Sequence, residues 1–201
     1  EADAPWDEAV FDSLYLGGGT PSVLDIADCV RLFDGLSRLF NWSTSPEITF
    51  ELNPEHRDLI TGLKRHTPVN RLSMGIQSFR LRFMRRRHSG REALEAIDMA
   101  AAQGFDNLSI DLIYGLPDMD EAEWAEQLET AAAYRPPHLS AYALTVEPGS
   151  LLSRQVTAGQ WRMPGQDALS EQYGLLTDWT ERQGYEGYEV SNFALPGHRA
   201  R

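Results

Sequence analysis

Short apolar runs alternate with longer segments of helical periodicity from one end of the chain to the other, and this alternation limits the fold more than any other feature. Strands joined by single helices form a largely parallel sheet with helices packed on it, so the chain is predicted to be an α/β protein. The predicted strands cover residues 14–17, 47–52, 70–76, 107–113, 138–144 and 188–193. The predicted helices cover residues 23–40, 56–65, 91–103, 121–134 and 166–183. The pattern fits either an open doubly wound sheet or a barrel of βα units.

The helix predicted at 91–103 has the clearest end signals. Ser89 and Glu92 have the spacing of a capping box at its start. Gly104 follows its last residue, at the position where a left-handed glycine often ends a helix. Because the sequence has no Gly- or Ser-rich linker and no sharp change of composition, it predicts a single domain over residues 1–201.

The net charge of −12 argues against nucleic-acid binding, because phosphate contacts need Lys and Arg in clustered excess. No apolar run approaches the roughly 18 to 20 residues that cross a bilayer, and the acidic start Glu1-Ala2-Asp3 is unlike a signal peptide. We therefore expect a soluble, cytoplasmic protein with no membrane span. Cys29 is the single cysteine, and its place on an apolar helix face predicts a buried structural thiol rather than a reactive one.

Polar residues follow or end five of the predicted strands. The first strand runs into Gly17-Gly18-Gly19-Thr20, where glycines without a Cβ let main-chain N–H groups approach a small charged ligand closely. The later strands carry, in order, Glu51 with Asn53, Gln77, Asp111, and Thr145 with Glu147. Taken singly, each has an ordinary explanation, such as a helix cap or a solvated strand end. Together they predict a polar site, because the carboxyl ends of parallel strands meet at one rim.

The residue types at this rim indicate the chemistry of the ligand. A carboxylate that accepts hydrogen bonds from vicinal hydroxyls is how α/β folds hold ribose, and a carboxylate beside glycine main chain suits an ammonium group. The sequence therefore predicts a nucleoside with an amino-acid-like tail. It has no Ser-His-Asp order, Walker lysine or His-Glu-x-x-His helix, so hydrolysis and phosphoryl transfer have little support.

Four segments resemble the radical S-adenosylmethionine proteins of the oxygen-independent coproporphyrinogen III oxidase group. They are Gly17-Gly18-Gly19-Thr20-Pro21, Glu51-Leu52-Asn53-Pro54, the stretch NRLSMGIQSF at 70–79 and the stretch DLIYGLP at 111–117. Such a set in this order is highly specific, and the resemblance covers essentially the whole chain. It implies a partial (β/α)6 barrel of the TIM type, with S-adenosylmethionine lying across the strand ends.

The resemblance also implies roles for individual residues. The methionine part of the cofactor would meet Gly18, Gly19 and Thr20. The site would be completed by Glu51, Gln77 and Asp111, with Asp111 nearest the ribose, while Thr145 would lie near the adenine. All of these cofactor-binding roles come from matching positions of the family pattern.

The family pattern also has an arginine shortly after the third strand, which matches Arg86. The interval from Gln77 to Arg86 is a few residues shorter than the pattern expects. Arg85 and Arg87 are therefore alternatives for this role. A second hypothesis is that loop residues between Phe79 and Arg85 are missing from the sequence.

Members of this family hold a [4Fe–4S] cluster with three cysteines in a Cys-x3-Cys-x2-Cys loop after the first barrel strand. Cys29 alone cannot provide such a loop, and it lies in a predicted helix. We therefore expect the chain to be part of a longer protein, without its first βα unit and C-terminal region, and with the cluster ligands upstream of Glu1. As it stands, the chain is expected to bind no cluster and to run no radical chemistry.

The segments YALTVEPG at 142–149 and YEVSNFALPGH at 188–198 look closer to the haem chaperone branch of the group than to the oxidases. The first functional hypothesis is therefore a chaperone that binds haem and passes it to an apo-haemoprotein, with an electron donor as a further partner. The second is oxidative decarboxylation of coproporphyrinogen III to protoporphyrinogen IX by a 5′-deoxyadenosyl radical. The third is a nucleoside-binding α/β module without catalysis. His88 and His198 are weak candidates for haem ligands, since a lone loop histidine is usually a surface group.

Overall fold

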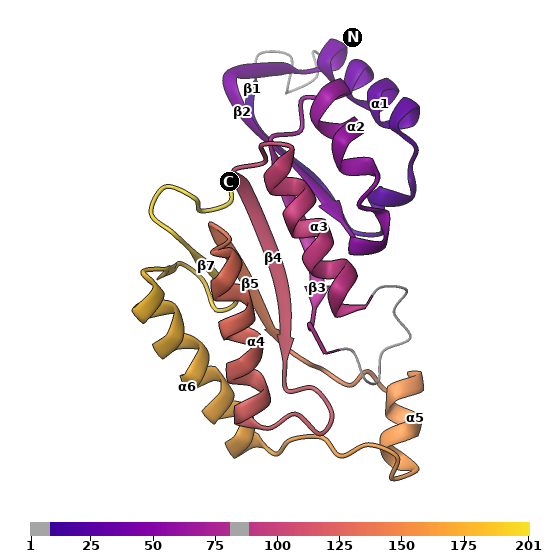
Figure 1. Ribbon diagram of the computed structural model, residues 1–201. Helices are drawn as coiled ribbons and strands as arrows, with labels where there is room; N and C mark the ends of the chain where they lie inside the picture. The colour runs from indigo at the N-terminus through magenta and orange to yellow at the C-terminus, as the bar shows by residue number, and fades with distance from the viewer. Residues whose placement is uncertain (1–8, 81–88) are drawn as a thin grey trace. The chain divides into compact units, whose positions relative to one another are not determined.

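The computed structural model describes residues 9–80 and 89–201, which form a mixed α/β fold (Figure 1). The first elements are β1 (Val10–Leu16), η1 (Pro21–Val23), α1 (Ile26–Leu39), β2 (Asn41–Leu52), η2 (Pro54–His56), α2 (Leu59–His66), β3 (Arg71–Gln77) and α3 (Gly90–Ala102). The later elements are β4 (Asn107–Tyr114), α4 (Glu121–Tyr134), β5 (His138–Ala143), α5 (Leu151–Thr157), α6 (Gln166–Gln183), β6 (Glu186–Gly187) and β7 (Asn192–Ala194). The strand order is β1-β2-β3-β4-β5-β7-β6. Every predicted helix is present, and so are the first five predicted strands, although β1 begins at Val10 rather than at residue 14 and β2 begins at Asn41 rather than at residue 47.

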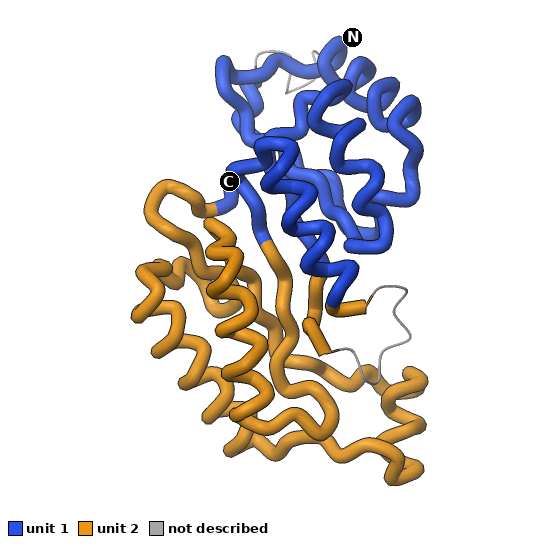
Figure 2. Tube along the Cα trace, viewed as in Figure 1, with its two compact units in different colours: residues 1–75, 91–109, 200–201 blue, residues 76–90, 110–199 orange. Residues whose placement is uncertain are grey.

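The chain divides into two compact units, which Figure 2 shows in different colours. Unit 1 contains Glu1–Gly75, Arg91–Ser109 and Ala200–Arg201. Unit 2 contains Ile76–Gly90 and Ile110–Arg199. The boundary runs through β3 and β4, so the last residues of both strands belong to unit 2.

Unit 1 is built on parallel pairing of β1 with β2 and of β2 with β3. The register places Leu16 beside Phe50 and Phe50 beside Leu72. The side chains of Phe50 and Leu72 are completely buried. Helix α1 begins at a cap in which the Asp25 carboxylate accepts the Asp28 N–H at 2.8 Å. Cys29 on this helix is 0% exposed, and burial raises the pKa of its thiol. The predicted buried thiol is confirmed.

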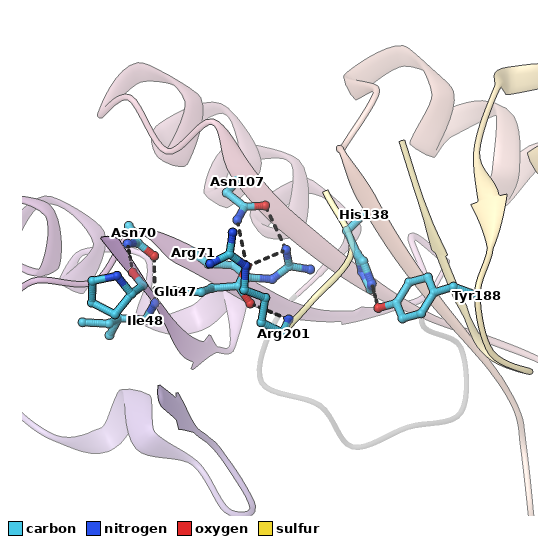
Figure 3. A network of polar contacts seen from close by, with 9 residues as sticks. Glu47, Ile48, Asn70, Arg71, Asn107, His138, Tyr188 and Arg201 are labelled. Atoms are coloured by element: carbon cyan, nitrogen blue, oxygen red, sulfur yellow. Dashed lines mark hydrogen bonds and ion pairs between the residues drawn. The ribbon is translucent and has the colours of Figure 1, made fainter. Parts of the chain in front are cut away.

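A buried ion pair lies among the strands of unit 1 (Figure 3). The guanidinium of Arg71 is 1% exposed and donates to the Asn107 amide oxygen at 2.9 Å, and it lies 3.7 Å from the Glu47 carboxylate. The other carboxylate oxygen of Glu47 accepts the Arg201 main-chain N–H at 3.0 Å. The Asn107 amide nitrogen also donates to the Glu47 carboxylate at 3.4 Å, so Glu47 has partners from β3, from β4 and from the segment at Arg201.

The end of α3 matches the expected left-handed cap. Gly104 has φ +76°, and the Phe105 N–H donates to the Ala100 carbonyl oxygen at 3.0 Å. This bond is the long hydrogen bond of a Schellman motif, which glycine permits without steric cost. The helix begins at Gly90, directly after the predicted capping residue Ser89.

Unit 2 packs α4 beside α6 (Figure 1). The Trp124 ring of α4 is completely buried, and its Nε1–H donates to the Gln172 carbonyl oxygen of α6 at 3.0 Å. Buried His138 on β5 shares a 2.6 Å hydrogen bond with the Tyr188 hydroxyl (Figure 3). These contacts tie both helices and the segment after α6 into one core.

The prediction of one parallel strand at 188–193 is wrong. The chain leaves α6 into the two-residue β6, turns, and returns as β7, which is antiparallel to both β6 and β5. The turn is closed by the Glu189 carboxylate, which accepts the Ser191 N–H at 2.9 Å. A hairpin needs only a few turn residues, whereas a parallel return needs a crossover connection, and the sequence between β6 and β7 is too short for one.

Helix α5 was not predicted, although the sequence contains a signal for it. Ser150 is its N-cap, and its hydroxyl oxygen accepts the Ser153 N–H at 3.0 Å. The preceding Pro148 and Gly149 resemble an ordinary loop, which hides this short helix in the sequence.

Among the described residues, none of the helices combines the length and the hydropathy that a bilayer crossing requires.

Stability at high pH is expected to depend on Tyr185, whose side chain is 6% exposed and whose hydroxyl donates to the Pro136 carbonyl oxygen. Burial raises the pKa of Tyr185 from 10.0 to about 12. The stabilisation is fully present below the unfolded-state pKa and is lost as pH rises through the folded-state value. We expect about 2 kcal/mol less unfolding free energy at pH 12 than at pH 10 from this group. Urea unfolding of the wild type and of Tyr185→Phe checks this, and an equal loss in both proteins would contradict it.

Candidate functional site

The first part of the candidate site is the glycine loop after β1, which contacts Glu51 at the end of β2. The register of the two parallel strands continues from Leu16 and Phe50, so that Gly17 and Glu51 come next along their strands. The Gly18 N–H donates to one carboxylate oxygen of Glu51 at 3.2 Å. The Tyr15 hydroxyl donates to the other oxygen at 3.0 Å. The structure thus brings together two of the predicted residues, Gly18 and Glu51, within unit 1.

Two glycines of the loop are needed for different reasons. A Cβ at Gly17 would lie 2.5 Å from a Glu51 carboxylate oxygen and 2.6 Å from the Tyr15 ring, so the close approach of these side chains requires glycine. Gly18 has φ +80°, a conformation that other residues rarely adopt. A Cβ at Gly18 or Gly19 would meet nothing within 4 Å, so this side of the loop is open to a small ligand.

The loops after β1 and β2 are joined by a second contact that sequence reasoning missed. Ser22, which is 5% exposed, shares a 2.8 Å hydrogen bond with Nδ1 of His56. The Ser22 hydroxyl oxygen also accepts the Asn53 N–H at 3.4 Å. These bonds hold the glycine loop against the start of η2. No local pattern indicates them, because the partners are more than 30 residues apart.

The second part of the candidate site lies in unit 2 and begins at the end of β3. Gln77 is half-buried and has φ +66°, which is strained for a residue with a side chain. The turn that follows is held by Gln127 of α4, whose amide oxygen accepts the Phe79 N–H at 2.7 Å. The chain direction at Gln77 is therefore fixed by tertiary contacts rather than by local preference.

Asp111 and Thr145 belong to the same unit. Asp111 is half-buried on β4, and Thr145 is exposed just after β5. Partial burial raises the pKa of the Tyr142 hydroxyl on β5, a Ser140 hydrogen bond opposes this, and the negative charge of Asp111 adds to the rise. Asp111 therefore acts electrostatically on the exposed end of β5. The Leu144 N–H donates to the Tyr114 carbonyl oxygen at 2.9 Å, which joins the chain before Thr145 to the end of β4.

The predicted site residues thus fall into two sets, one in each unit. Arg86 and its alternatives Arg85 and Arg87 lie outside the described residues, as does His88. Gly19 and Thr20 are exposed in the glycine loop beside Gly18. That the two sets bind one ligand stays a prediction.

Residues 2–131 match the family model of the radical SAM superfamily, which covers more than half of the 201 residues. The chain therefore belongs to the radical SAM superfamily. The protein "Heme chaperone HemW" of Mycobacterium tuberculosis strain H37Rv is 34% identical over 204 residues, which cover 100% of this chain and 52% of that protein. The protein of the same name from Escherichia coli K12 is 34% identical over 194 residues, which cover 94% of this chain and 50% of that protein.

A solved structure described as "Coproporphyrinogen III oxidase (HemN) from Escherichia coli is a Radical SAM enzyme" matches with a TM-score of 0.82. It is 26% identical, and the match covers 94% of this chain and 44% of that chain. This confirms the predicted radical SAM fold with a partial barrel, and it confirms the resemblance to the coproporphyrinogen oxidase group. The chain spans about half the length of the curated relatives it matches.

Membership of this superfamily implies S-adenosylmethionine and a [4Fe–4S] cluster. The glycine loop and Glu51 fit the amino-acid end of S-adenosylmethionine, because an open loop with main-chain polar groups lies beside a carboxylate. Asp111 carries a carboxylate, the group with which α/β folds accept hydrogen bonds from ribose hydroxyls. The residues of this chain do not fit the cluster, because Cys29 is its one cysteine and is completely buried in α1. Among residues 9–80 and 89–201, no group of three His, Cys, Asp or Glu could hold a metal ion.

Proposed function

We propose that the protein is a haem chaperone of the radical SAM superfamily, which binds haem and transfers it to an apo-haemoprotein. The observation that carries the proposal is the 34% identity to proteins named heme chaperones over at least 94% of this chain. The identity to the coproporphyrinogen oxidase is lower, at 26%. The chaperone therefore has more support than oxidative decarboxylation of coproporphyrinogen III or a nucleoside-binding module without catalysis.

S-adenosylmethionine is proposed as the bound cofactor, with Gly18, Gly19, Thr20 and Glu51 at its amino-acid end. Glu51 would accept hydrogen bonds from the ammonium group of the cofactor. The glycine loop would contact the amino-acid end of the cofactor without steric hindrance. The proposed nucleoside contacts are Gln77, Asp111 and Thr145, with Arg86 as a further contact. When bound beside a [4Fe–4S] cluster, this cofactor supplies a 5′-deoxyadenosyl group for radical chemistry.

A haem titration tests the chaperone proposal. Haemin added to the purified protein is expected to give a saturable Soret absorbance change, and an apo-haemoprotein added afterwards is expected to acquire that haem. With the expected upstream cysteines present and the cluster reconstituted, anaerobic incubation with coproporphyrinogen III and S-adenosylmethionine is expected to yield no protoporphyrinogen IX. Protoporphyrinogen formation would favour the oxidase, and nucleoside binding without haem binding would favour the third candidate. The proposal also includes an electron donor as a partner, which co-purification tests. It includes a cytoplasmic location, which cell fractionation tests.

Replacing Gly17 by alanine tests the amino-acid end of the proposed site. The new Cβ would overlap the Glu51 carboxylate and displace it from the Gly18 N–H. We expect the dissociation constant for S-adenosylhomocysteine, measured by calorimetry, to rise about tenfold. Gly35→Ala in α1 is the matched control, because a Cβ there has open space. Unchanged affinity in Gly17→Ala would contradict the proposed role of Glu51.

A further inference from the structure

We propose that Gln172 in α6 is a positioning residue, which holds the loop after β4 and thereby the nucleoside end of the proposed site. The inference rests on the proposed function, since it concerns a residue that acts on that site through other residues. Gln172 lies beyond residues 2–131, the stretch that the family model matches. Its role is therefore read from the contacts of this chain alone.

The side chain of Gln172 bridges two points of the loop between β4 and α4. It is completely buried. Its amide oxygen accepts the Gly115 N–H at 2.8 Å, and its amide nitrogen donates to the Met119 carbonyl oxygen at 3.2 Å. A glutamine offers one acceptor and donors on the same group, so a single side chain satisfies two main-chain groups of opposite kind. Without the Gln172 amide, the Gly115 N–H and the Met119 carbonyl oxygen would be buried and would lose this hydrogen-bond partner.

The loop between β4 and α4 packs closely against α6 at Gly115. Gly115 has φ +71°, and a Cβ at this position would lie 2.4 Å from the Leu169 side chain of α6. The main chain of Gln172 is itself held by the buried Trp124 Nε1–H, which donates to its carbonyl oxygen at 3.0 Å. The amide of Gln172 is thus presented to the loop from a fixed backbone.

The loop is connected directly to the residues proposed to contact the nucleoside. Gly115 follows Tyr114, whose carbonyl oxygen accepts the Leu144 N–H at 2.9 Å. Leu144 directly precedes Thr145, and Asp111 lies three residues before Tyr114 on the same strand. Loosening of Gly115 is therefore expected to weaken the bond that sets the position of Thr145.

Gln172→Met tests the role of the amide, since methionine keeps the length of the side chain but has neither the amide donor nor the amide acceptor. In this variant we expect the amides of Gly115 and Leu144 to exchange hydrogen faster. We also expect the dissociation constant for S-adenosylhomocysteine to rise about tenfold. Thr180→Val is the matched control on α6, because Thr180 is buried and its hydroxyl donates to the Thr177 carbonyl oxygen of its own helix at 2.9 Å.

Gln172→Glu adds a signature that a purely structural role would not give. A protonated glutamic acid has an O–H donor and a carbonyl acceptor, so it can make both bonds of glutamine, whereas the carboxylate can only accept. Burial raises the pKa of such a group. We therefore expect Gln172→Glu to bind nearly as tightly as the wild type at pH 5 and as weakly as Gln172→Met at pH 8. The ratio of wild-type to Gln172→Met affinity should not change between these two pH values.

The outcomes separate this inference from the function on which it rests. A wild-type chain that binds no S-adenosylhomocysteine contradicts the proposed cofactor and, with it, the inference. Wild-type binding together with unchanged affinity or unchanged exchange at Gly115 and Leu144 in Gln172→Met overturns the inference alone. If Gln172→Met does not fold, the pH profile of Gln172→Glu decides, and a profile without recovery at pH 5 overturns the inference.

Discussion

Glu51→Gln is expected to raise the dissociation constant for S-adenosylhomocysteine about 100-fold, because a hydrogen bond between charged groups contributes about 1.5 to 3 kcal/mol and the ammonium would lose its counter-charge. The carboxylate already accepts the Gly18 N–H and the Tyr15 hydroxyl, so its position is set before a ligand arrives. Calorimetric titration measures the change. Because the amide of glutamine has nearly the same shape, the thermal unfolding temperature should change little.

Tyr15→Phe is the companion variant, since it removes one hydrogen bond to Glu51 and leaves the charge in place. Its effect on the dissociation constant should be several times smaller. If both variants weaken binding equally, the charge of Glu51 is not what binds the ligand. Adenosine binding should be insensitive to both, because adenosine lacks the ammonium group.

Arg71→Met is expected to lower the unfolding free energy by about 3 to 5 kcal/mol, because it removes one partner of a buried ion pair. The Glu47 side chain is 10% exposed, so water cannot fully replace the guanidinium that lies 3.7 Å away. Asn107 would also lose the donor to its amide oxygen. Urea unfolding monitored by circular dichroism measures the change.

The double variant Glu47→Leu with Arg71→Met separates the ion pair from simple packing. Replacing both charges by apolar groups avoids an unpaired buried carboxylate, so the double variant should be more stable than Arg71→Met alone. An additive loss would show that the two side chains stabilise the fold independently. Arg31→Met is a surface control, because its pair with Asp28 is mostly exposed and contributes little.

Most helix and strand boundaries could be predicted from the sequence, because they depend on local signals. The helices Glu121–Tyr134 and Gln166–Gln183 begin and end where the periodicity predicts, and Gly104 ends α3 as expected. The hairpin β6–β7 was missed, since the apolar pattern of one strand does not reveal its direction relative to β5. Strand direction follows from the connection and from tertiary packing.

The candidate site, like the fold, could be predicted from the sequence only in part. The type of residue at each strand end was visible in the sequence, and the contact between Gly18 and Glu51 agrees with the expected position of both. The supporting residues Tyr15, Ser22 and Gln172 were not predicted. Each acts through a partner more than 30 residues away, and only the strand register or the helix packing shows which partner that is.

The hairpin at the end of the chain has a consequence for self-association. In the part of the chain that the structure describes, β6 ends the strand order, and it has only two residues. Its outer main-chain groups are therefore too few to align a strand from another molecule over several hydrogen bonds. Short terminal strands of this kind discourage edge-to-edge polymerisation. Within the described residues, the reversal between β6 and β7 therefore leaves this edge of the sheet with few of the main-chain groups that an added strand would need.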